Sequence, residues 1–144
     1  MTRTILLARP HPFIVNEMRP LLAQAGFDVK AVINDAALAG IDTASCSAAV
    51  ISLAVISPVS QSPQQVLATL KELGFAGKII FAGLVPFERV ENNIKQFLTA
   101  SGWHIDVHAL SSRDARRSSA VYIQQSDLAP AQAIASRDFL SAWV

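Results

Sequence analysis

Short apolar segments alternate along the chain with longer segments in which apolar residues recur at helical spacing. The apolar segments have the length of β-strands and end at proline, glycine or short polar stretches. They are Thr4–Ala8, Phe27–Ile33, Ala48–Ile56, Lys78–Ala82 and Trp103–Leu110. This alternation is typical of βαβ units with right-handed crossovers, and it predicts a parallel sheet.

The segments between these strands predict the helices that cover the sheet. They are Phe13–Ala25, a short helix within Asn34–Ala44, a helix from Pro63 or Gln64 to Leu73, Glu88–Ala100 and Pro130–Val144. Pro20 lies inside the first of these helices, where it lacks an N–H and obstructs the carbonyl of Asn16. A proline in a helix interior costs about 3 kcal/mol, so a bend is expected near Asn16.

The most apolar segment, Ala48–Ile56, indicates a strand that is buried on both faces at the centre of the sheet. The predicted fold is therefore a doubly wound, flavodoxin-like α/β domain. It has five parallel strands in the order 2-1-3-4-5 and helices on both faces. Residues 111–119 predict an exposed loop, and Ala120–Gln124 fits either a sixth short strand or part of a helix.

A single domain is expected over residues 1–144, with a core at about residues 3–118 and a C-terminal extension or terminal helix at 119–144. The chain ends on the apolar residues Ala142, Trp143 and Val144. This ending leaves open that the sequence is part of a longer protein with a separate output domain.

The composition adds one constraint to this picture. Hydrophobic residues make up 51% of the chain and charged residues 16%, and the mean hydropathy is +0.36. A disordered chain has the opposite balance. The apolar excess suits a sheet buried on both faces or a surface covered by a partner.

Charge and cysteine content exclude several functions. The net charge is +1, and the one basic cluster, Arg113 to Arg117, contains Asp114, so nucleic-acid binding is not expected. The single cysteine and the histidine spacing do not form a zinc motif, and neither a metal nor a cofactor is expected. With no signal peptide or membrane span indicated, a reduced, cytoplasmic location is expected.

Motifs around the first predicted helix resemble those of response-regulator receiver domains. They are Ile5–Phe13 (ILLARPHPF), Arg19–Leu22 (RPLL) and Ala25–Val29 (AGFDV). The family typically shows an apolar strand, an acidic pair, His-Pro, a helix with paired leucines and then Ala-Gly-Phe-x-Val. Val50-Ile51-Ser52 with Pro58 also resembles the family's third strand and the proline after its phosphoacceptor. The resemblance covers residues 3–110 in order and length.

The same resemblance implies that the phosphorylation chemistry is lost. The family's acidic pair matches Arg9 and Pro10, and its phosphoacceptor matches Leu53 (or Ser52). The hydroxyl residue of its switch matches Ala82 or Gly83, and its lysine matches His108 or Ala109. A guanidinium repels Mg²⁺, which needs oxygen ligands, and neither leucine nor serine forms an aspartyl phosphate. The chain is therefore identified as a degenerate receiver, or pseudo-receiver.

Arg9, His11 and His108 are candidates for an anion site, because ligands bind at the carboxyl edge of such sheets. The plainer interpretation, which is favoured, makes His11 a capping residue and His108 an ordinary residue at a strand end. Arg9 would then form an ion pair with Asp35 or Asp106.

Aromatic residues suggest where a partner would bind. The candidates are Phe87, Phe97, Trp103, Tyr122, Phe139 and Trp143. Receivers usually signal through the face of the fourth helix, the fifth strand and the C-terminal helix, so the resemblance implies that face.

The expected function is that of a non-enzymatic pseudo-receiver of a two-component or related bacterial signalling protein. It would regulate a partner or its own output domain by contact, and a homodimer is expected. The alternative is a domain that senses a small molecule or an anion, or an enzyme, at the carboxyl edge of the sheet.

Overall fold

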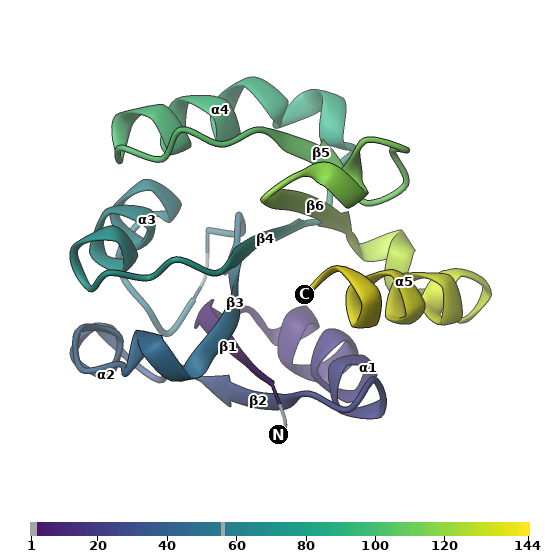
Figure 1. Cartoon of the computed structure of the whole chain (residues 1–144), viewed down its shortest axis with the longest axis horizontal. Coiled ribbons are helices and arrows are strands. Elements are labelled where there is room, and N and C mark those ends of the chain that lie inside the picture. Colours follow the sequence, from purple (N-terminus) through teal and green to yellow (C-terminus); the bar gives the residue numbers. More distant parts are fainter. Residues whose placement is uncertain (1–2, 56) are drawn as a thin grey trace.

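The computed structural model describes residues 3–55 and 57–144 and contains a parallel sheet between two layers of helices (Figure 1). The strands are β1 Thr4–Arg9, β2 Asp28–Ala31, β3 Cys46–Ser52, β4 Lys78–Gly83, β5 Val107–Ala109 and β6 Ala120–Gln124. The predicted α/β class and parallel pairing are confirmed. Ile56, expected at the end of the third strand, lies outside the described residues.

The sheet has six strands in the order β2-β1-β3-β4-β6-β5. The predicted order 2-1-3-4-5 is therefore wrong beyond the fourth strand, because β6 lies between β4 and β5. Burial explains this order. Four of the five residues of β6 are buried, and Val121 pairs with Ile80 on one side and with His108 on the other. β5 has three residues, of which one is buried, and therefore suits the sheet edge.

The longer helices occupy the predicted segments. They are η1 Ile14–Met18 and α1 Arg19–Gln24, α2 Asp35–Ala39, α3 Pro63–Glu72, α4 Glu91–Ala100 and α5 Pro130–Trp143. Short 3₁₀ helices lie at η2 Thr43–Ser45, η3 Phe87–Arg89, η4 Ala115–Arg117 and η5 Gln125–Leu128. One core cluster joins α2, α3 and α4 to the sheet, and a second joins η1, α1 and α5 to its opposite face (Figure 1).

Pro20 reshapes the helix that follows β1. Residues Ile14–Met18 form a π-helical turn, in which the Arg19 N–H donates to the carbonyl of Ile14, five residues earlier. α1 then begins at Arg19, which places Pro20 in its first turn, where its missing N–H is tolerated. The irregularity expected near Asn16 thus takes the form of a π turn.

Residues 120–144 belong to the packed core of this fold. The side chains of Leu140 and Trp143 on α5 are buried, and the Trp143 indole N–H donates to the Ser118 carbonyl at 2.9 Å. The Arg3 guanidinium, from the start of the chain, donates to the Ser141 carbonyl at 2.9 Å. Within residues 3–55 and 57–144, no helix is long and apolar enough to cross a bilayer.

Candidate functional site at the carboxyl edge of the sheet

Exposed hydrophobic side chains gather in the loops that leave the carboxyl ends of the strands. Five large hydrophobic side chains in the described part of the chain are exposed, and four of them lie here. Their exposed fractions are 72% for Ile33, 94% for Val55, 52% for Leu84 and 37% for Val85, while the fifth, Ile134 on α5, is 63% exposed. We call Val55, Leu84 and Val85 the edge patch. Open α/β sheets bind their ligands at this edge.

Arg9 ends β1 directly beneath this surface, and its side chain is only 5% exposed. Its Nη1 donates to the carbonyls of Ser52 at 2.7 Å and Ala54 at 2.6 Å, and its Nε donates to the Gln61 carbonyl at 2.8 Å. Burial lowers the pKa of Arg9 from its ordinary value. The guanidinium therefore fastens the loop between β3 and α3.

Asp35, at the start of α2, holds the same loop from the other side. Its carboxylate accepts hydrogen bonds from the Ser60 hydroxyl, from the Ser60 N–H at 2.9 Å and from the Gln61 N–H at 3.4 Å. These bonds, chiefly the one from the Ser60 hydroxyl, lower the pKa of Asp35. The described residues contain two ion pairs, Lys95–Glu91 and Arg137–Asp138. The expected pairing of Arg9 with Asp35 or Asp106 is therefore wrong.

The candidate anion-binding residues do not come together. His11 lies at the carboxyl edge beside Leu53 and Gly83. His108 lies within β5 and lines a separate hollow with Asp106 and Ser118, which come just before β5 and β6. That hollow is at the amino ends of the strands. The proposed site of Arg9, His11 and His108 is not assembled.

Gly83 ends β4 at the position that the receiver resemblance assigns to a hydroxyl residue. A Cβ atom at Gly83 would lie 2.5 Å from the phenolic oxygen of Tyr122, so the Tyr122 ring fills that space. The Tyr122 hydroxyl donates to the Val85 carbonyl at 2.5 Å, and burial raises its pKa to about 12. Ala82, the other candidate for this position, is fully buried.

The other positions that the receiver resemblance matches also lack that family's chemistry. Leu53 follows β3, its side chain packs against the core, and its N–H donates to the Ala82 carbonyl at 2.9 Å. Pro10 follows Arg9 in the loop after β1. On the side away from β3, β4 pairs with β6, so Gln124 lies beside Gly83. His108 and Ala109, which the resemblance matches to the lysine, stand on the edge strand β5. None of these side chains is a carboxylate or an amine.

An apolar hollow of about 380 Å³ lies at the carboxyl edge of the sheet. Its lining includes His11, Leu53, Val55, Leu84, Val85 and Tyr122. Within the described ranges, no group of three histidine, cysteine or acidic residues is placed to hold a metal ion. The site therefore suits binding by apolar contact.

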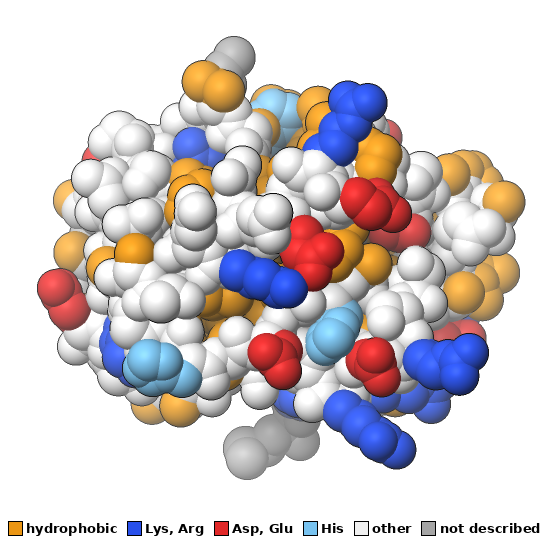
Figure 2. Space-filling view, turned by 90° about the horizontal axis from the view of Figure 1, so that it is seen from above, with side chains coloured by type: hydrophobic (Ala, Val, Ile, Leu, Met, Phe, Trp, Pro, Cys, Tyr) orange, Lys and Arg blue, Asp and Glu red, His pale blue; other side chains and the backbone are white. Residues whose placement is uncertain are grey.

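The aromatic residues expected at an interface mostly belong to the core. Trp103, Tyr122 and Trp143 are buried, and the Trp103 indole N–H donates to the Leu67 carbonyl at 3.0 Å. The rings of Phe87 and Tyr122 are tilted by 36° with centroids 5.6 Å apart, and Phe97 and Phe139 pack half-buried against the core. The surface on the α4 side carries acidic and basic side chains interspersed with each other (Figure 2). The expectation that aromatic residues anchor a partner on the face of α4, β5 and α5 is therefore wrong for Trp103, Tyr122 and Trp143, which are buried.

Sequence reasoning did not identify the edge patch. Its signal lies in loops, where Val55 follows the third strand and Leu84-Val85 stands between Gly83 and Pro86. Apolar residues next to turn residues at a strand end predict either the end of a strand or a loop, whereas their exposure depends on the tertiary fold.

The chain has a flavodoxin-like parallel α/β fold in which β2, β1, β3 and β4 keep the order of receiver domains. Comparison with protein-family models and with curated proteins finds no match for this chain.

Proposed function

We propose that this chain is a pseudo-receiver of a two-component or related signalling system, which binds a protein partner through the edge patch without being phosphorylated. The clustering of Val55, Leu84 and Val85 at the carboxyl edge carries this proposal. The domain would regulate an output domain or a partner, and it catalyses no reaction. Its first expected partner is a second copy of the chain.

The energetics favour contact at this surface. Removing apolar area from water is worth about 25 cal/mol per Å², so fully covering a valine or leucine side chain contributes about 1.5–3 kcal/mol. Exposed apolar clusters of this kind mark interaction surfaces in soluble domains. A phosphoryl-driven switch has no support in the chain, because no carboxylate stands at the positions of the acidic pair or the phosphoacceptor.

Sedimentation velocity over a wide concentration range tests this proposal. We expect the wild-type chain to form dimers and Val55→Asp/Leu84→Asp to remain monomeric. The matched control is Ile134→Asp, because Ile134 is 63% exposed but lies on α5. A wild-type chain that is monomeric at every concentration, or a dimer that only Ile134→Asp disrupts, would contradict the proposal.

A further inference from the structure

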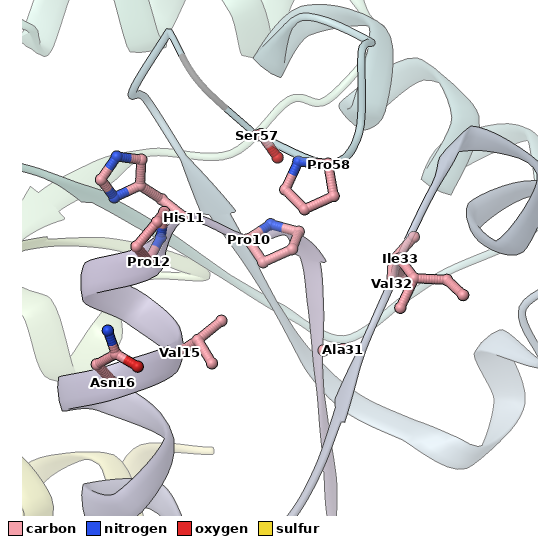
Figure 3. Close-up of a pocket in the computed structure, with 10 residues that line it drawn as sticks. All are labelled: Pro10, His11, Pro12, Val15, Asn16, Ala31, Val32, Ile33, Ser57 and Pro58. Carbon is pink, nitrogen blue, oxygen red and sulfur yellow. The ribbon is translucent and has the colours of Figure 1, made fainter.

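A second hollow of about 620 Å³ opens beside the edge patch, between η1 and the end of β2 (Figure 3). Prolines at positions 10, 12 and 58 line it, together with Val15 from η1, and Ala31 and Ile33 from the β2 side. We call it the proline groove. The volumes of small-molecule sites range over about 300–1,000 Å³, so the groove has room for one such molecule.

The lining of the proline groove defines the chemistry of a ligand. None of its lining residues carries a formal charge at neutral pH with histidine neutral, and its polar side chains are those of His11, Asn16 and Ser57. Arg9, which precedes the lining residue Pro10, donates to three backbone carbonyls instead. An ionised ligand would lose its hydration here without gaining an opposite charge. The lining therefore favours a neutral, mainly apolar molecule.

His11 supplies a hydrogen-bond donor at the rim. Its Nδ1 accepts the Phe13 N–H at 3.3 Å, so in the neutral ring the proton lies on Nε2. Nε2–H can then donate to an oxygen of a ligand. A carbonyl or ether oxygen on the ligand would match this donor.

The walls of the groove are preorganised. Proline fixes the backbone φ angle, and three prolines contribute to the lining. Arg9 and Asp35 hold the β3–α3 loop, which carries Ser57 and Pro58. A preformed site loses little conformational entropy on binding. The π turn at Val15 and Asn16 fits the same role, since such turns are frequent at functional sites.

Ile33 shows that the groove lacks a covering group within the described chain. It is 72% exposed although it stands next to the buried Val32. A ligand in the groove would cover it. We propose that the proline groove binds a neutral, mainly apolar small molecule that carries one hydrogen-bond acceptor.

Acetophenone and benzoate form a matched pair of probes, because both are aromatic and of similar size but only benzoate is charged. Each is titrated into the ¹⁵N-labelled chain and followed by NMR. We expect acetophenone to give saturable shifts at the amides of Val15, Asn16 and Ile33, and benzoate to bind at least about tenfold more weakly. Ile33→Ser should weaken acetophenone binding about tenfold, whereas Ile134→Ser, at an exposed position on α5, should leave it unchanged.

Several outcomes would overturn the proposal. These are no saturable shifts, benzoate binding as tightly as acetophenone, or binding that Ile33→Ser leaves intact. Shifts confined to Leu84 and Val85 would place the ligand in the neighbouring hollow instead. Shifts at Val15 and Ile33 when the protein alone is concentrated would identify a second copy of the chain as the occupant.

Discussion

Arg9 is a buried cation whose charge is balanced by backbone carbonyls. Its three bonds join the end of β1 to Ser52, Ala54 and Gln61. Removing it leaves these carbonyls without their charged donor, and hydrogen bonds to charged groups contribute about 1.5–3 kcal/mol. The residue that the receiver resemblance matches to the acidic pair thus acts as a structural clamp.

We expect Arg9→Ala to lower the free energy of unfolding by about 2–4 kcal/mol, because several buried carbonyls lose their donor at once. Urea unfolding followed by circular dichroism measures this change. Arg89→Ala, on the exposed 3₁₀ helix η3, is the control and should change stability by less than about 0.5 kcal/mol. Equal stability of the two variants would show that Arg9 does not clamp the loop.

Tyr122 is the one tyrosine of the chain, so phenolate absorbance reports it alone. Burial raises its pKa to about 12, which means that the folded state favours the neutral phenol. The protonated phenol contributes about 2–3 kcal/mol to the free energy of unfolding. This contribution is complete below pH of about 10 and is lost as the pH rises from about 10 to about 12.

We expect phenolate absorbance to appear near pH 12 in the folded chain and near pH 10 in urea. Tyr122→Phe should remove the part of the alkaline destabilisation that belongs to this group. A folded-state midpoint near pH 10 would show that the phenol is solvated.

At the scale of elements, the end of β4 depends on its neighbour β6. Gly83→Ser introduces a hydroxyl at the position that the receiver resemblance matches to the switch residue, but it places a Cβ 2.5 Å from the Tyr122 oxygen. We expect a loss of about 1–3 kcal/mol in the free energy of unfolding, as for other overpacked sites. Gly40→Ser is the control, since its nearest atom would lie 3.7 Å away.

Adding Tyr122→Phe to Gly83→Ser should recover part of that loss, because the closest clashing atom is removed. Denaturant unfolding of the four chains completes the double-mutant cycle. Additive losses would mean that Tyr122 does not occupy the space beside Gly83.

The strand order makes a separate prediction. β6 is paired on both sides and buried, whereas β5 is a three-residue edge strand. We expect hydrogen-bonded amides of β6 to exchange at least about tenfold more slowly than those of β5. Native-state hydrogen exchange by NMR measures both, and faster exchange in β6 would contradict the observed order.

The first four strands and their helices could be predicted because their signals are local. Apolar runs end at turn residues, and the position of Pro20 predicts an irregular helix near Asn16. The position of β6 could not be predicted in this way, because it depends on which of two short strands buries both faces. The hydrogen-bond partners of Arg9 could not be predicted for a similar reason. They are backbone carbonyls, which every residue has, so the residue types do not single them out.

At the scale of the whole molecule, the carboxyl edge combines a receiver-like strand order with an apolar surface. The proline groove shares His11 with the neighbouring apolar hollow, which the edge patch lines. Arg9, Asp35 and Tyr122 hold the structure beneath them through hydrogen bonds to the loops. This edge therefore suits apolar contact and not phosphoryl transfer.

The most direct measurement is a titration of the ¹⁵N-labelled chain with Mg²⁺ and beryllofluoride, which mimics a phosphoryl group on an aspartate. We expect no saturable shift at the amides of Arg9, Leu53 and Gly83, because no carboxylate stands at those strand ends. Saturable shifts confined to these amides would show a working phosphoryl site and would contradict the account.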